Sequence, residues 1–287
     1  MPALPALAFF LRFNLAFATV SALPVISRFI VLLACALPVA TPAARAQTVH
    51  APAPAPAVNL IVTPAYVSQY LFRGQRLGGQ SFQPTLELGY GNLGVGVWAN
   101  FPVSSKVAGV SDPEVDPYAY YMFALTDTIS LVPGFTYYTY PRAETRHGFY
   151  RSTFEPNLAV SWSVKGVKLT PKVYYDLTLD GPTFEITAGY AVPLRQLGTE
   201  LDFTLQAGEY LQRDVVNHSA AQTKAWGQYW LVGMAVPFQF SAHSKFTLGF
   251  AYTEGVKAFT KAGSTPRIPN VLAVRRGVVN FSYTRSF

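Results

Sequence analysis

The chain has one cysteine, Cys35, among its 287 residues. Cys35 lies in an apolar run near the amino terminus that we expect to be removed, so the mature chain is expected to carry no thiol. Such a chain forms no disulfide and no thiolate metal site. The absence also suits passage through an oxidising compartment, where an unpaired cysteine is a hazard.

Long apolar runs are absent after residue 46. No window there approaches the roughly 20 residues that a membrane-spanning helix needs. The 17 Tyr and 21 Phe residues are instead scattered along the chain. A helical membrane protein is therefore excluded for residues 47–287.

Recognisable catalytic and metal-binding patterns are missing too. Outer-membrane barrels that hydrolyse lipids resemble one another in a His-x-Ser pair, a spacing that puts base and nucleophile on one face of a strand. Here His218 and His243 each directly precede a serine, while His50 lies near the amino terminus and His147 between expected strands. No His-Glu-x-x-His spacing occurs. The sequence predicts a non-enzyme without a metal or cofactor.

Charge is sparse and only mildly basic. The whole chain has 22 basic and 15 acidic residues, a net charge of +7. Removing Arg12, Arg28 and Arg45 with the leader leaves 19 basic against 15 acidic residues, or +4. This balance is not that of a nucleic-acid-binding protein.

The amino terminus has the composition of an export signal. Residues 1–46 contain no acidic residue, include the apolar run 29–40 and end in Ala44-Arg45-Ala46, a small-residue cleavage pattern. We expect 1–46 to be a cleaved signal peptide; a lipoprotein site at Cys35 is the alternative. Residues 47–57, in which Ala and Pro alternate from 51 to 57, are expected to be an extended spacer before a domain at 58–287.

In the rest of the chain, apolar and polar side chains alternate with a period of two residues. In residues 275–287, Val279, Phe281, Tyr283 and Phe287 fall on one face of an extended strand, and small polar residues on the other. A terminal aromatic after such a strand resembles the signal that the barrel-assembly machinery reads in outer-membrane proteins. The pattern predicts lipid on one face and a polar lumen on the other.

Similar alternation recurs about twelve times. The expected strands are 58–72, 81–91, 93–101, 116–126, 128–140, 154–164, 166–179, 182–194, 200–211, 226–239, 245–254 and 274–287. Short links alternate with mostly longer ones, which is typical of outer-membrane barrels. We predict an all-β fold: a transmembrane antiparallel up-and-down β-barrel of about twelve strands with both termini in the periplasm.

Two observations count against this fold. A soluble β-sandwich also alternates, although it would not place large aromatic residues on one side of nearly every strand. Prolines inside the expected strands remove ladder donors, and a closed barrel has no edge to hold them. They are Pro64, Pro84, Pro133, Pro156, Pro171, Pro193 and Pro237.

A family resemblance adds to this interpretation. The segment 68–74, Ser-Gln-Tyr-Leu-Phe-Arg-Gly, is followed by Gln-Ser-Phe-Gln-Pro at 80–84 and Gly-Val-Gly-Val-Trp-Ala-Asn at 94–100. Together they resemble a proteobacterial outer-membrane porin family, also called TorF, whose members open with Tyr-x-x-Arg-Gly. The resemblance implies export, a barrel and transport, and it implies no particular substrate.

Strand parity assigns the charged residues to two groups. Those expected to face the lumen, where they either pair or line a water-filled channel, are Glu87, Glu155, Lys168, Lys172, Asp176, Glu185, Glu200, Asp202, Lys245 and Arg276. Those expected at a basic outer mouth are Arg73, Arg76, Arg142, Arg146, Arg151, Lys257, Lys261 and Arg267. The mouth would bind lipopolysaccharide phosphates or concentrate small anions.

Aromatic residues near the strand ends suggest an interfacial girdle. Its expected members are Tyr70, Phe72, Tyr137, Tyr140, Tyr175 and Trp226. The sequence as a whole predicts a bacterial outer-membrane channel for passive diffusion of small polar or anionic solutes. The alternative is a closed structural or adhesion barrel with a plugged lumen and partner-binding outer loops.

Overall fold

A computed structural model describes residues 58–107, 112–144, 150–213, 224–260 and 267–287. All of them belong to one compact unit, residues 54–287. The expected signal peptide and spacer lie outside the described residues, as do His50, His147 and His218. No helix within the described ranges is long and apolar enough to cross a membrane.

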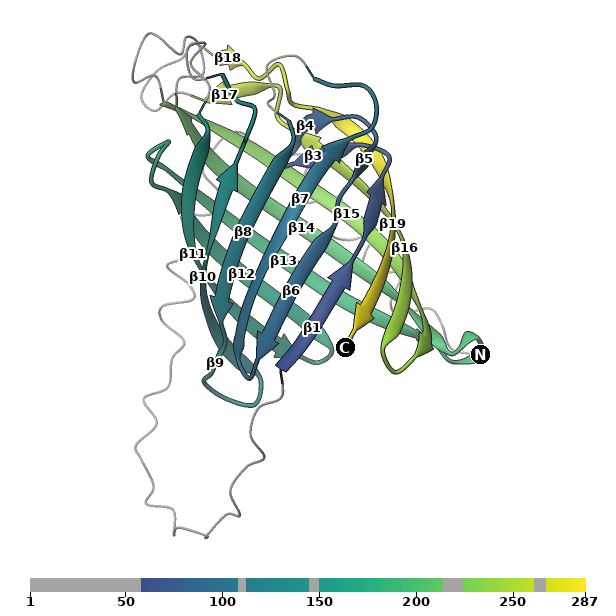
Figure 1. The fold of residues 1–287 in the computed structure, drawn as a ribbon. Coiled ribbons are helices and arrows are strands. Elements are labelled where there is room, and N and C mark those ends of the chain that lie inside the picture. Colours follow the sequence, from purple (N-terminus) through teal and green to yellow (C-terminus); the bar gives the residue numbers. More distant parts are fainter. Residues whose placement is uncertain (1–57, 108–111, 145–149, 214–223, 261–266) are drawn as a thin grey trace, which may run out of the picture. The chain divides into compact units, whose positions relative to one another are not determined.

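The described residues form a closed antiparallel barrel of 12 strands (Figure 1), as the alternation predicts. Two wall strands are each built from two pieces, β1 with β2 and β6 with β5, and β9 continues β8 after a break at Met122. Closure comes from β19, which pairs with β16 on one side and with β1 and β2 on the other. The wall consists of β1 (Val58–Thr63), β2 (Ala65–Val67), β5 (Ser81–Phe82), β6 (Thr85–Tyr90), β7 (Leu93–Pro102), β8 (Glu114–Tyr121), β9 (Phe123–Ala124), β10 (Ile129–Thr139), β11 (Ser152–Val164), β12 (Val167–Asp176), β13 (Gly181–Leu194), β14 (Thr199–Arg213), β15 (Lys224–Ser241), β16 (Ser244–Gly255) and β19 (Arg275–Ser286).

The two ends of the barrel differ in their connections. At one end the strands join through tight turns, such as Gly91-Asn92, Lys165-Gly166 and the short 3-10 helix η2 (Arg195–Leu197). We call it the short-turn end, and β1 begins and β19 ends there. The opposite, long-loop end carries most of the longer connections and the small hairpin of β17 (Ala258–Thr260) and β18 (Arg267–Pro269).

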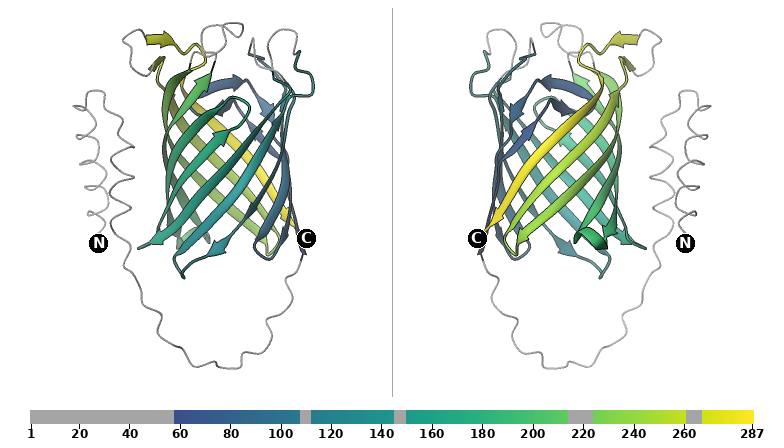
Figure 2. Two further views of the ribbon diagram at one scale, coloured as in Figure 1. Left: turned by 90° about the vertical axis from the view of Figure 1, so that its left-hand side faces the viewer. Right: turned by 90° about the vertical axis from the view of Figure 1, so that its right-hand side faces the viewer.

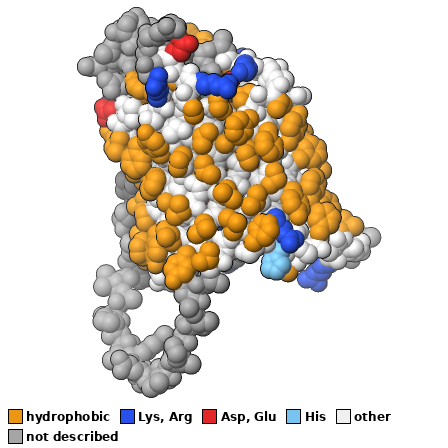
Figure 3. All heavy atoms as spheres, in the orientation of Figure 1, with side chains coloured by type: hydrophobic (Ala, Val, Ile, Leu, Met, Phe, Trp, Pro, Cys, Tyr) orange, Lys and Arg blue, Asp and Glu red, His pale blue; other side chains and the backbone are white. Residues whose placement is uncertain are grey.

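Apolar side chains cover the outer face of the wall. Leu88 in β6, Val95 in β7 and Phe250 in β16 are each 46–47% exposed. Figure 3 shows this apolar face across the wall, with Lys and Arg side chains near its two ends. A continuous exposed apolar surface of this kind fits lipid rather than water.

The prolines are accommodated by interruptions of the hydrogen-bond ladder. Pro64 separates β1 from β2, and Pro84 separates β5 from β6. Pro133 of β10 lies opposite the break between β8 and β9. Pro171 pairs with Ile186 of β13, but the pairing of β12 with β11 skips its position. A barrel without edges therefore holds proline where one neighbouring strand does not need its missing donor.

Tyrosine rings lie over glycines on the inner face of the wall. Tyr118 covers Gly96, and Tyr229 covers Gly208, each on the neighbouring strand. A Cβ added at Gly96 would meet the Tyr118 ring at 2.5 Å. Glycine at these positions leaves room for the ring.

Candidate functional site

The first connection at the long-loop end turns inward. Residues 68–80 join β2 to β5 and contain β3 (Tyr70–Phe72) and β4 (Gln75–Gly78), which form a two-stranded sheet apart from the wall. Figure 2 shows these strands inside the upper part of the barrel. We call residues 68–80 the inner hairpin. The expected wall strand 58–72 is confirmed only for residues 58–67, which form β1 and β2. Tyr70–Phe72 turn inward instead, and so do Arg73 and Arg76, which were expected at the outer mouth.

The family-like motif makes the turn of the inner hairpin. Arg73 and Gly74 are its two central residues, with φ of 48° and 72°. Two successive positive φ values are the type I′ geometry that matches the twist of a tight hairpin. A Cβ on Gly74 would lie 2.6 Å from the Tyr229 Cβ and 2.7 Å from the Gly255 Cα. Both the turn and its close approach to β15 and β16 therefore require glycine.

Backbone hydrogen bonds hold the turn against the segment that precedes β19. The Val274 N–H donates to the Gly74 carbonyl at 3.0 Å, and the Arg76 N–H donates to the Leu272 carbonyl at 2.9 Å. Gln75 forms a β-bridge with Ala273. The inner hairpin thus begins beside β19 and β7 and reaches the segment that precedes β19.

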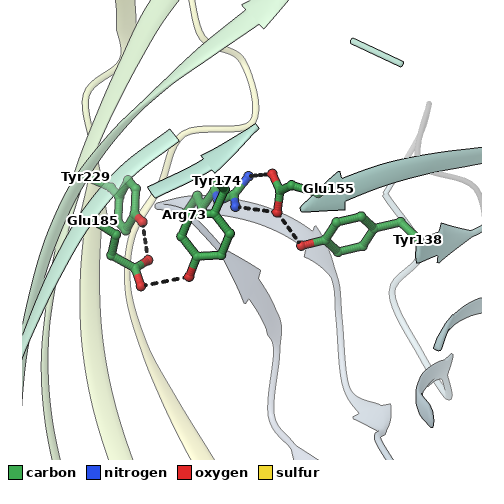
Figure 4. Close-up of polar contacts among 6 residues, drawn as sticks. All are labelled: Arg73, Tyr138, Glu155, Tyr174, Glu185 and Tyr229. Carbon is green, nitrogen blue, oxygen red and sulfur yellow. Dashed lines mark hydrogen bonds and ion pairs between the residues drawn. The ribbon is translucent and has the colours of Figure 1, made fainter. Parts of the chain in front are cut away.

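Arg73 forms the ion pair that anchors the turn (Figure 4). Its guanidinium donates to both carboxylate oxygens of Glu155 in β11, each at 2.9 Å. The Tyr138 hydroxyl donates to the same carboxylate at 2.9 Å. The side chains of Arg73 and Glu155 are only 13% and 2% exposed. Burial disfavours the charged form of Arg73, but the adjacent Glu155 carboxylate outweighs it and holds the pKa of Arg73 above its ordinary value.

A second carboxylate lies beside this pair. Glu185 of β13 accepts hydrogen bonds from Tyr174 of β12, at 3.1 Å, and from Tyr229 of β15. The Arg73 guanidinium and the Lys172 ammonium lie over the Tyr174 ring, 4.8 Å and 4.5 Å from its centroid. Charges and tyrosines from five wall strands therefore meet around the hairpin turn.

The base of the inner hairpin is also tied to the wall. Gln69 donates to the Gly277 carbonyl at 3.0 Å and accepts from Arg276 at 3.1 Å. Tyr70 lies against Trp98 of β7, with ring centroids 5.6 Å apart. The hairpin therefore contacts the wall near its base as well as at its turn.

Buried amides fix the far side of the turn. The Gln75 amide donates to Asn270 at 3.3 Å, and the Asn270 amide donates to the Tyr210 hydroxyl at 3.1 Å. All three residues are buried. Because a buried polar group without a partner is unfavourable, this chain of amides favours one position of the hairpin.

A cavity of about 770 Å³ adjoins the inner hairpin within the lumen. Hairpin residues Gln69, Tyr70 and Phe72 contribute to its lining. The wall contributes aromatic rings from β7, β8 and β10 and small polar residues from β14, β16 and β19. This volume lies within the usual range for small-molecule sites, about 300–1,000 Å³.

The charged residues predicted for the lumen have different surroundings. Glu155 and Glu185 meet at the hairpin turn, and Lys172 lies beside them. Glu87 accepts hydrogen bonds from Tyr118 at 2.6 Å and Tyr120 at 3.0 Å. Asp176 accepts from the backbone of Thr178 and Leu179, and so caps the turn after β12. By strand alternation, Lys168, Glu200, Asp202 and Lys245 fall on the inner face towards the short-turn end.

The predicted basic mouth is not one surface. Arg73 lies inside the barrel, bound to Glu155, and Arg76 lies in β4 of the inner hairpin. Both were expected at the outer mouth, and that prediction was wrong because the inner hairpin carries them into the barrel. Arg142, Arg151 and Lys257 are exposed at the long-loop end. Arg146 and Lys261 lie outside the described residues, and Arg267 lies in β18, where the side chain is not described.

The residues predicted for the aromatic girdle do not all face outward. Tyr137 and Tyr175 face outward, 40% exposed, and Trp226 stacks on Phe184. Tyr70, Phe72 and Tyr140 do not join them. Tyr70 and Phe72 belong to the inner hairpin, and the Tyr140 hydroxyl donates to the buried Glu114 at 3.1 Å.

Sequence reasoning missed the tyrosines and two of the acids. Tyr174 alternates with Lys172 and Asp176, so its parity could have placed it on the inner face. Glu114 and Asp116 begin β8, both almost fully buried. Glu114 was assigned to a loop because Pro113 and Pro117 conceal the start of that strand. Across the described ranges, no three His, Cys, Asp or Glu side chains gather as a metal site.

Comparisons with known proteins give likeness only at the level of structure. No family model and no curated protein matches the chain, so the TorF-like resemblance stays a prediction. A solved KdgM porin is similar with 11% identity and a TM-score of 0.46, over 79% of this chain and 99% of that one. An outer-membrane channel of the COG4313 group from Pseudomonas putida F1 has 14% identity and a TM-score of 0.45, over 82% of this chain and 97% of that one.

Proposed function

We propose that this chain is a bacterial outer-membrane channel through which small polar solutes diffuse. One observation carries the proposal: a closed barrel whose outer face is apolar and exposed encloses a polar lumen with a cavity of about 770 Å³. Lipid satisfies the outer face, while hydroxyl, amide and charged groups inside favour water and polar solutes. The absence of enzymatic activity stays a prediction.

The inner hairpin makes the proposed passage narrow. It contacts the wall at β7 on one side and at β19 on another. Its turn carries the buried ion pair of Arg73 with Glu155, which favours the inward position. A narrow passage restricts the proposal to small solutes. The same hairpin also favours the second candidate, a closed structural or adhesion barrel with a plugged lumen.

Single-channel recording in planar bilayers tests both candidates. The refolded barrel is compared with a variant in which residues 69–79 are replaced by a short Gly-Ser linker. We expect small, steady conductance from the natural chain and a clear increase from the variant. Conductance from the variant alone would support the plugged barrel. Absence of conductance from both the natural chain and the variant would refute the channel.

The solute's charge is a separate part of the proposal. The preference for anions rested on the basic mouth, of which Arg142, Arg151 and Lys257 are the exposed, described members. We propose that these three bind lipopolysaccharide phosphates, since exposed guanidinium and ammonium groups pair readily with phosphate. The reversal potential in a salt gradient measures the preference, and cation selectivity would exclude an anion channel.

Assembly in the membrane is proposed to depend on Phe287. Its side chain is 67% exposed, while its backbone pairs with Leu60 at the seam between β1 and β19. The ring is thus available to the barrel-assembly machinery although the strand is already paired.

A further inference from the structure

The cavity beside the inner hairpin has two chemically different sides. One side presents aromatic rings, namely Trp98 of β7 and Tyr118 of β8. The other presents short polar side chains, Thr204 of β14, Thr247 of β16 and Asn280 of β19. Small residues between them, such as Gly249, leave space: a Cβ there would lie 3.8 Å from the Asn280 Oδ1.

Four polar side chains of this lining have no hydrogen-bond partner among the described residues. Across the described ranges, the side chains of Trp98, Thr204, Thr247 and Asn280 make no hydrogen bond to another residue. They are not buried polar groups left unsatisfied, because within those ranges the Nε of Arg76 is the one buried side-chain nitrogen or oxygen without a partner. Their donors and acceptors therefore face open space in the cavity.

Ionisable groups are scarce in the same lining. Among the described residues that line the cavity, Asp116 is the one with a charged side chain. Asp116 is only 3% exposed and accepts from the Thr139 N–H at 3.2 Å. The charged groups at the hairpin turn are engaged with one another, as the bidentate bond of Arg73 to Glu155 shows. An anionic solute would leave water here without gaining a positive charge, and a cationic solute would meet only the carboxylate of Asp116, which is almost fully buried. The loss of hydration therefore disfavours both.

We propose that the cavity is a binding site for a neutral, polyhydroxylated solute such as a sugar. The apolar face of a sugar ring would lie on Trp98, and its hydroxyls would bond to Thr247, Asn280 and their neighbours, which supply both donors and acceptors. The inner hairpin bounds one side of the site and slows the exit of the solute. The inference deepens the proposed function, because it names the solute class for the same lumen.

Tryptophan fluorescence can detect solute binding at this site independently of conductance. The chain has four tryptophans, and Trp98 is the one that faces the lumen. Trp162 and Trp230 are exposed on the outer face, and Trp226 stacks on Phe184. A variant with Trp162→Phe, Trp226→Phe and Trp230→Phe therefore reports on Trp98 alone.

The full mature chain of this variant, folded in detergent, is titrated with sucrose, glucose, glucuronate and glucosamine. We expect sucrose or glucose to change the Trp98 emission saturably, and the two charged sugars to bind at least about tenfold more weakly. Equal or tighter binding of glucuronate or glucosamine would overturn the assignment to a neutral solute. No change with any sugar would overturn the site itself.

Substitutions locate the binding within the cavity. Thr247→Val combined with Asn280→Leu removes two hydrogen-bonding groups, so we expect at least about tenfold weaker binding. Thr284→Val is the matched control, since Thr284 also faces inward but bonds to Thr63 and does not line the cavity. Equal effects of the two changes would contradict the site. Conductance without sugar binding would refute this inference alone, and binding without conductance would refute the channel alone.

Discussion

At the scale of single residues, Arg73 combines two roles that usually fall to different positions. It occupies a turn position with positive φ, which is unfavourable for a side chain with a Cβ. It also supplies a guanidinium that pairs bidentately with Glu155 in a buried setting. The ion pair offsets the cost of the backbone conformation and fixes the turn inside the barrel.

Breaking this pair should release the inner hairpin. Arg73→Gln leaves the Glu155 carboxylate buried without its cation, a change that destabilises proteins by about 3–5 kcal/mol. We expect a lower free energy of unfolding in lipid vesicles and fluctuating conductance in single-channel recordings. Arg73→Gln combined with Glu155→Gln removes both charges and should recover part of the loss.

Arg275→Gln is the control for that experiment. Arg275 pairs with Glu254 at 2.7 Å but its side chain is 63% exposed. An exposed pair contributes at most about 1 kcal/mol. If Arg275→Gln and Arg73→Gln lowered stability equally, the special weight assigned to the buried pair would be wrong.

At the scale of elements, neighbouring strands fit together through tyrosine and glycine. Tyr229 of β15 lies over Gly208 of β14 and reaches Glu185 of β13 with its hydroxyl. One ring thereby joins three strands. The position of the ring depends on the missing side chain beneath it.

A methyl group at Gly208 should therefore disturb the contact of Tyr229 with Glu185. Its Cβ would lie 2.6 Å from Tyr229 Cζ, so Gly208→Ala must displace the ring and its bond to Glu185. Overpacking of this kind lowers stability by about 1–3 kcal/mol, measurable by denaturant unfolding in lipid vesicles. Gly189→Ala is matched, because its nearest neighbour would be 3.9 Å away, and it should leave stability within about 0.5 kcal/mol. Similar losses from the two variants would contradict the packing argument.

The wall strands could be predicted from the sequence because alternation records which side faces lipid. Phe281, Tyr283 and their counterparts in other strands signal that face directly. The inner hairpin could not be predicted in the same way. Its strands have three and four residues, too few for a period to show, and Tyr70 to Phe72 continue the apolar pattern of β2. What holds them inside are partners such as Glu155 and Asn270, which are remote in sequence.

At the scale of the whole molecule, the barrel distributes its apolar and polar side chains in the opposite way to a soluble protein. Large apolar side chains are exposed outside, while Glu155 and Ser81 are the largest fully buried side chains of the described residues. Stability then comes from the closed hydrogen-bonded wall and from polar contacts inside it. Such a molecule depends on lipid or detergent.

Gel electrophoresis checks this arrangement. We expect the mature chain to require detergent for a monodisperse solution and to migrate at different positions in SDS before and after boiling. The closed wall resists SDS until heat breaks its ladder of hydrogen bonds. A chain that stays monodisperse without detergent and shows one mobility would contradict the barrel in a membrane.

The inner hairpin also sets an order of events during assembly. It follows the first wall strand, yet its partners lie far downstream: Glu155 is 82 residues beyond Arg73, Asn270 is 195 beyond Gln75, and Gly277 is 208 beyond Gln69. Contacts between such distant segments form late, because long stretches of chain must first be brought together. The inner hairpin therefore cannot dock until β11 and β19 are in place, and its docking belongs to the same late stage of assembly as closure of the wall between β1 and β19.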